Sequence, residues 1–181
     1  MWNLSNDLSI HNGWIDHMQT QQMIDFLRLA NQVAIRVMNS GHHPFGALLV
    51  APDGVTVLEE QGNVDTVNHA ESTLARRAYA KYSSDVLWAS TLVTTVEPCA
   101  MCAATQYWSH IGRLIYGVTE HDLLALTGNH AENPTLNLPC REVFSAGQKG
   151  IVVMGPVSEM REEILEVHRN FWRRTQSTQD Q

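Results

Sequence analysis

Hydrophobic residues recur along the chain with periods that are typical of helices and of buried strands. Over residues 20–38 they fall three and four positions apart, and Gly41 ends the run. Residues 44–50 then form a largely apolar run, which a Pro-Asp-Gly turn joins to a return strand over residues 55–60. This pattern predicts a long amphipathic helix followed by a β-hairpin.

After the hairpin the pattern alternates between helices and strands. We expect further strands over residues 91–96, 114–118 and 150–154. We expect further helices over residues 70–82, 99–108, 122–126, 141–146 and 156–174. The last of these helices is expected to carry on its inward side Met160, Ile164, Leu165, Val167, His168 and Phe171. This order of elements predicts an α/β fold, a three-layer α/β/α sandwich around a five-stranded mixed sheet.

The length of 181 residues is enough for one domain with a full core and too short for two. Residues 1–19 are polar and have no clear period, so we expect an N-terminal arm followed by a single domain over residues 20–181. No stretch has the length and apolarity of a membrane span, and residues 1–7 lack the features of a signal peptide. A cytoplasmic protein is therefore expected.

The charge distribution limits the class of partner. The formal net charge is -7, and the basic residues are scattered apart from the pairs Arg76-Arg77 and Arg173-Arg174. A surface that binds nucleic acid needs a basic patch, and both pairs are better explained as solvated helix faces. The composition therefore argues against a nucleic-acid partner and favours a small-molecule substrate.

Candidate metal ligands lie where a predicted strand meets a predicted helix. Pro98 ends strand pairing and suits a first helical turn, so Cys99 and Cys102 share one face of the helix that follows. The positive end of this helix favours their thiolate forms, and together they can hold one metal ion. A third ligand is available in His69, just before another predicted helix. Zn²⁺ with three protein ligands leaves one coordination position open, as in catalytic sites.

Two other interpretations of these residues remain. A Cys-x-x-Cys pair is also typical of redox proteins, although His69 and Glu71 would then have no role. The pair also fits a structural zinc module, in which Cys140 or another histidine closes the coordination sphere. By itself, a His next to a Glu at a helix start is more often a capping arrangement than a ligand.

A hydrolytic deamination needs a nucleophilic water and a group that carries its proton to the departing amine. Zinc can lower the pKa of a water molecule toward neutrality. Glu71, two residues beyond His69, can face that water without binding the metal, and a carboxylate serves first as base and then as acid. We expect main-chain groups around Glu97 and Pro98 to bond the edge of the substrate ring.

The motifs His69-Ala70-Glu71 and Pro98-Cys99-Ala100-Met101-Cys102 resemble those of the cytidine deaminase-like superfamily of zinc-dependent enzymes. The segments 44–47, 62–64 and 107–108 are similar to those of bacterial guanine deaminases and tRNA adenosine deaminases. The resemblance implies that Asn63 contacts the base, that Phe45 lies against it and that Trp108 borders the pocket. Without the resemblance, core packing would explain Phe45 and Trp108 as well.

The resemblance to guanine deaminases is closer than that to the tRNA enzymes, because Glu120-His121-Asp122 stands where the tRNA enzymes have a basic, glycine-rich stretch. It implies a homodimer and an acidic contact to the purine, for which Glu132 is a candidate, although a solvated loop charge is equally plausible. Phe171-Trp172 is expected either to cover a neighbouring site or to pack in the core. We therefore expect a zinc-dependent deaminase of a free nucleobase or related aminated heterocycle, most of all guanine, with a tRNA adenosine deaminase as the alternative.

Overall fold

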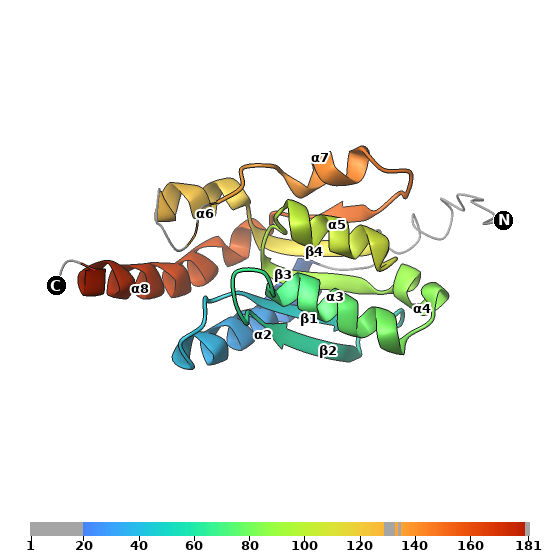
Figure 1. Cartoon of the computed structure of the whole chain (residues 1–181). Coiled ribbons are helices and arrows are strands. Elements are labelled where there is room, and N and C mark those ends of the chain that lie inside the picture. The colour runs from blue at the N-terminus through green and yellow to red at the C-terminus, as the bar shows by residue number, and fades with distance from the viewer. Residues whose placement is uncertain (1–19, 129–132, 134, 180–181) are drawn as a thin grey trace.

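A five-stranded mixed sheet forms the centre of the molecule (Figure 1). The structure is a computed structural model that describes residues 20–128, 133 and 135–179. The strands are β1 (Gly46–Val50), β2 (Val57–Gly62), β3 (Thr91–Val96), β4 (Arg113–Val118) and β5 (Val152–Met154). Their order across the sheet is β2-β1-β3-β4-β5; β1 pairs antiparallel with β2 and β3, whereas β3, β4 and β5 run parallel.

Helices cover both faces of this sheet. They are α2 (Thr20–Asn39), α3 (Ala70–Lys81), α4 (Ser84–Ala89), α5 (Ala100–Trp108), α6 (Glu120–Thr127), α7 (Cys140–Ser145) and α8 (Arg161–Gln179), with a short 3-10 helix over Ser158–Met160. Helices α3 and α5 lie in front of the sheet in Figure 1, and α2 lies behind it. The expected three-layer α/β/α sandwich with a five-stranded mixed sheet is confirmed.

The sheet separates two hydrophobic cores. In β1, Leu48 and Val50 pack toward α2 and α8, while Ala47 and Leu49 pack toward α3 and α5. A strand with helices on both faces must be apolar at every position, because successive side chains point to opposite faces. This explains why the sequence of β1 is a continuous apolar run and does not alternate.

The boundaries of some elements differ from those expected. The return strand runs over Val57–Gly62 and not over residues 55–60, and α4 was not expected at all. The last helix begins at Arg161, because the 3-10 helix over Ser158–Met160 takes up the preceding residues. The expected arm over residues 1–19 lies outside the described residues.

No helix among the described residues is both long enough and apolar enough to cross a membrane.

Candidate metal centre and active site

Three side chains from two helix N-termini converge on one point. His69 precedes the first residue of α3, Cys99 precedes the first residue of α5, and Cys102 lies in the first turn of α5. Neither His69 nor Cys99 caps its own helix through its side chain, so the capping interpretation of His69 is wrong. The possible ligand atoms of His69, Cys99 and Cys102 all lie within 4.8 Å of one another.

The spacing of these atoms fits tetrahedral zinc. His69 Nδ1 lies 3.7 Å from Cys99 Sγ and 3.6 Å from Cys102 Sγ. A tetrahedral ion with a Zn–S distance of about 2.3 Å and a Zn–N distance of about 2.1 Å separates the two ligand atoms by about 3.6 Å. The donor set and its spacing therefore match a bound zinc ion without rearrangement.

The two thiols have different environments: the pKa of the Cys102 thiol is raised, first by its hydrogen bond to Cys99 and then by burial, whereas the pKa of the Cys99 thiol is lowered. Hydrogen bonds from Cys102, and then from His69, lower the pKa of the Cys99 thiol to about 4. Among the described residues, no fourth His, Cys, Asp or Glu joins the group, and Cys140 lies apart from it at the start of α7. The described residues thus do not form the closed structural zinc site with Cys140 as a ligand.

Glu71 lies beside the metal ligands without belonging to them. Its side chain is buried, Thr94 Oγ1 donates a hydrogen bond to Oε1 at 2.9 Å, and Oε2 lies 3.5 Å from Cys102 Sγ. Burial raises the pKa of the Glu71 carboxyl above its ordinary value. A carboxyl whose pKa moves toward neutrality is suited to accept and return a proton.

The rings of Phe45 and His69 lie parallel to each other beside the other metal ligands, and the place that they flank is called the slot below. Their ring planes are parallel within 4°, and their centroids are 6.4 Å apart. Gly46 allows Phe45 this position because a Cβ atom at residue 46 would meet the carbonyl oxygen of Ala30, on α2, at 2.1 Å. The start of β1 is thereby held against α2, with the Phe45 ring facing the metal ligands.

Asn63 is hydrogen-bonded to the backbone of Phe45. Its backbone N–H donates to the carbonyl oxygen of Phe45 at 3.0 Å, and its side-chain amide donates to the carbonyl oxygen of Asp65 at 3.2 Å. The side chain is buried, at the end of β2 and just before the loop that leads to His69. The structure therefore brings Phe45, Asn63 and His69 together.

Glu97 and Pro98 connect β3 to α5. The Glu97 carboxylate accepts hydrogen bonds from the backbone N–H groups of Glu120, at 3.2 Å, and Cys140, at 2.9 Å. Its side chain therefore holds the beginnings of α6 and α7 in place. A contact between the main chain here and a substrate ring remains a prediction.

Glu120, which in the sequence served only to compare enzyme families, also lies in this region. Its side chain is buried, and burial, followed by the charges of Cys99, Glu71 and Glu97, raises the pKa of its carboxyl to about 8. A signal for its position exists in the sequence: β3 and β4 are parallel neighbours, so the residues after each strand meet at the same edge of the sheet.

Two expected substrate contacts are not brought to the site. Trp108 lies at the opposite end of α5 from the metal ligands, is 75% exposed, and faces Tyr107 and Lys149. With Arg76 and Tyr79 it lines a surface cavity of about 610 Å³. Within one chain Trp108 therefore does not border the slot. Glu132 lies outside the described residues.

Comparisons with known proteins agree with this geometry. The family model for the cytidine and deoxycytidylate deaminase zinc-binding region matches residues 20–118. A probable cytosine deaminase from Schizosaccharomyces pombe is 33% identical over 156 residues, which cover 84% of this chain and 94% of that protein. A tRNA-specific adenosine deaminase from Aquifex aeolicus is 29% identical over 118 residues, covering 62% of this chain and 78% of that protein.

The fold is also shared with a solved structure. A guanine deaminase from Nitrosomonas europaea superimposes with a TM-score of 0.61, at 22% identity, over 85% of this chain and 84% of that chain. The segment matched by the family model contains His69, Cys99 and Cys102. The chain therefore belongs to the cytidine and deoxycytidylate deaminase family, whose members bind zinc in this region.

Proposed function

We propose that this protein is a zinc-dependent hydrolytic deaminase of a free nucleobase or a related aminated heterocycle, with guanine as the first candidate. The observation that carries the proposal is the slot between Phe45 and His69, beside the zinc ligands and the buried Glu71. Bound zinc supplies a Lewis acid that lowers the pKa of a water molecule at the open coordination position.

The parallel rings beside the zinc ligands suit a planar substrate. The Phe45 and His69 planes are parallel within 4° and their centroids are 6.4 Å apart, so the two rings share the orientation in which a flat heterocycle stacks on an aromatic face. Asn63, whose backbone N–H bonds the Phe45 carbonyl oxygen, is the residue that we assign to the ring edge.

Glu71 transfers the proton. Thr94 holds one oxygen of its carboxyl, which leaves the other oxygen, next to Cys102, to exchange protons. Glu71 takes a proton from the attacking water and then delivers it to the exocyclic nitrogen, so that the C–N bond breaks and ammonia leaves. The product carries a carbonyl oxygen in place of the amine.

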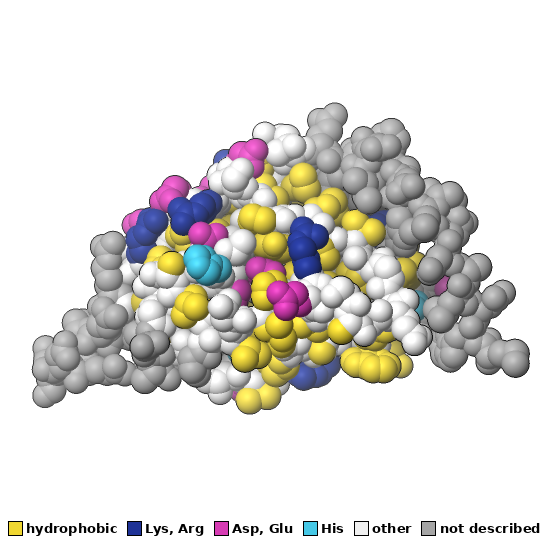
Figure 2. All heavy atoms as spheres, turned by 90° about the horizontal axis from the view of Figure 1, so that it is seen from above, with side chains coloured by type: hydrophobic (Ala, Val, Ile, Leu, Met, Phe, Trp, Pro, Cys, Tyr) yellow, Lys and Arg dark blue, Asp and Glu magenta, His cyan; other side chains and the backbone are white. Residues whose placement is uncertain are grey.

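The surface favours a free base over tRNA. With a net charge of -7, electrostatic attraction to phosphates is weak. On the face shown in Figure 2, the Lys and Arg side chains lie in separate small groups, with acidic side chains beside several of them. The buried carboxyl of Glu120 adds an acceptor for ring or amino N–H groups, which guanine offers.

Cytosine is the second candidate substrate. The S. pombe relative, described as a probable cytosine deaminase, matches this chain over nearly its whole length. The Phe45–His69 slot accepts a pyrimidine as readily as a purine, because stacking depends on the ring face. The edge contacts from Asn63 and Glu120 decide between the two bases.

The test is ammonia release by the zinc-loaded protein. We would offer it guanine, cytosine, adenine, cytidine, guanosine and a tRNA anticodon stem-loop, with Glu71→Gln in parallel. We expect one free base to react, and Glu71→Gln to lower kcat by about 10²- to 10⁴-fold with an unchanged zinc content.

Glu142→Gln, an exposed change of the same kind on α7, is the control and should keep full activity. A zinc-loaded protein that releases ammonia from no free base, or only from the stem-loop, would contradict the proposal.

A further inference from the structure

The last described helix places an unusual residue in the core behind the slot. His168, on α8, has no exposed surface. Trp172 Nε1 donates a hydrogen bond to His168 Nδ1 at 3.3 Å, so the neutral imidazole carries its proton on Nε2. Burial lowers the pKa of His168 to about 3, which keeps the ring neutral.

The Nε2 atom of this ring has no hydrogen-bond partner among the described residues. A buried polar atom without a partner lowers the stability of the fold, and an apolar side chain at this position would avoid that cost. Packing alone therefore does not account for a histidine here. The explanation has to come from what its ring contacts.

His168 belongs to an aromatic cluster formed by His43, Phe45, His168, Phe171 and Trp172. The His168 ring meets the Phe45 ring at a centroid distance of 5.0 Å and an angle of 66°. His43 packs edge-to-face against Phe171 and Trp172 at 5.5 and 5.0 Å. The cluster thus joins α8 to the segment just before β1, where Phe45 is located.

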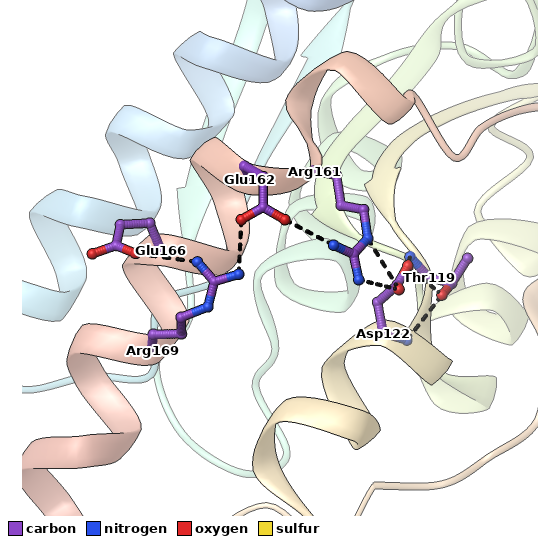
Figure 3. A network of polar contacts seen from close by, with 6 residues as sticks. All are labelled: Thr119, Asp122, Arg161, Glu162, Glu166 and Arg169. Atoms are coloured by element: carbon purple, nitrogen blue, oxygen red, sulfur yellow. Dashed lines mark hydrogen bonds and ion pairs between the residues drawn. The ribbon is translucent and has the colours of Figure 1, made fainter.

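The helix that carries His168 is fixed from its outer side. Arg161 binds Asp122 of α6 at 3.0 Å, and the network shown in Figure 3 continues along α8 itself, where Arg169 binds Glu162 at 2.8 Å. Asp122 itself is held by a capping box with Thr119 at the start of α6. The start of α8 is therefore joined to α6 by the Arg161–Asp122 pair, and the buried side of α8 is joined to Phe45 through His168.

We propose that His168 is a positioning residue, which holds the Phe45 ring parallel to the His69 ring and so keeps the slot open for the substrate heterocycle. Trp172 fixes the His168 ring, and the edge-to-face contact fixes the Phe45 ring plane. The proposal rests on the proposed function, because it assigns the substrate to the slot between Phe45 and His69.

Two substitutions at His168 test whether an aromatic ring is needed at this position. His168→Leu removes the aromatic contact and keeps an apolar side chain, whereas His168→Phe keeps a ring against Phe45. Ile164→Val, one turn earlier on the same buried side of α8, is the control for a purely structural loss.

We expect His168→Leu to raise KM for guanine or cytosine about three- to tenfold, with kcat within about twofold of the wild-type value, because a stacking wall acts on ground state and transition state alike. His168→Phe and Ile164→Val should keep KM within about twofold. Calorimetric titration of 8-azaguanine and of cytosine, in the Glu71→Gln background, should show the same pattern in Kd without turnover.

The outcomes separate this inference from the proposed function. A wild-type protein that deaminates a free base while His168→Leu keeps wild-type KM and Kd would overturn the role of His168 and leave the proposed function standing. Equal losses in His168→Leu and His168→Phe would also overturn it, because the ring would then not be the feature that matters. A wild-type protein that neither binds nor deaminates these bases would contradict both the proposed function and the role of His168.

Discussion

Three buried polar side chains around the slot each form a hydrogen bond within the protein. Thr94 holds Glu71, backbone N–H groups hold Glu97, and Trp172 holds His168. A buried polar group that is hydrogen-bonded keeps one geometry, because breaking the bond inside the protein is costly. The site is thus ordered by its own hydrogen bonds before any substrate enters.

The Thr94 hydroxyl can be removed with almost no change in shape. We expect Thr94→Val to lower kcat by about tenfold, the worth of one hydrogen bond to a buried carboxyl, because Glu71 loses its fixed orientation. Steady-state kinetics on the preferred base would measure this. Thr91→Val on the same strand is a matched control, since Thr91 Oγ1 is buried and has no hydrogen-bond partner among the described residues. An equal loss in Thr91→Val would show that strand packing is responsible.

The zinc content of cysteine variants tests which thiols bind the metal. We expect Cys102→Ala to reduce bound zinc from about one ion per chain to a small fraction, because two ligands do not hold the metal tightly. Cys140→Ala, which removes another buried thiol, should leave the zinc content unchanged. Metal analysis after gel filtration would decide this. A loss of zinc in Cys140→Ala would instead support the structural zinc site in which Cys140 is the fourth ligand.

At the scale of elements, long periodic segments were predictable and short ones were not. The helical period of apolar residues predicted α2, and the continuous apolar run of β1, joined by a turn to the return strand, predicted the hairpin. Helix α4 has six residues, too few to establish a period. The zinc ligands could be recognised because their motif is local, whereas His168 was hidden in the apolar stripe of α8, where a buried histidine looks like any other core position.

Helix α3 is fastened to strand β2 by a group that responds to pH. Lys81, followed by Arg77, binds the nearly buried Glu59 carboxylate, and the pKa of Glu59 is lowered from its ordinary value of 4.5. A carboxyl with a lowered pKa stabilises the fold above its unfolded-state pKa, and this stability is lost as the pH falls through the folded value.

We therefore expect Glu59→Gln to reduce the free energy of unfolding by about 0.5 to 1 kcal/mol near pH 7, a small value because both basic partners are about half exposed. The difference from wild type should shrink below about pH 4.5. Urea denaturation across this range would measure it. Glu60→Gln, in an exposed pair with Arg36, is the control and should have a smaller effect. A difference that grows in acid would contradict the assignment.

At the scale of the whole molecule, the candidate site and the exposed aromatic surface lie at opposite ends of α5. Cys99 and Cys102 lie at its N-terminal end, and Trp108, 75% exposed, lies at its C-terminal end near Tyr79, which is 62% exposed. Large aromatic side chains gathered on one surface are typical of protein interfaces. We propose that this face forms the contact between two copies of the chain.

A charge placed on this face should weaken the dimer. We expect Trp108→Lys to raise the dimer dissociation constant at least about tenfold, because a central aromatic anchor is lost and an ammonium group has to be buried. Sedimentation velocity over a concentration series would measure it. Leu29→Lys, on an exposed part of α2 in the opposite layer, is the control. A wild-type protein that is monomeric at all concentrations would end this proposal.

The two open edges of the sheet have a consequence for how copies of this chain can aggregate. In the part of the chain that the structure describes, β2 and β5 are the outer strands. Strand β2 carries Glu59 and Glu60, and its register with β1 shifts between Leu49 and Val50, while β5 has only three residues. Acidic side chains, a bulge and short length each discourage a second strand from adding to an edge. Both edges of the sheet thus carry features that disfavour fibril-like growth by strand addition.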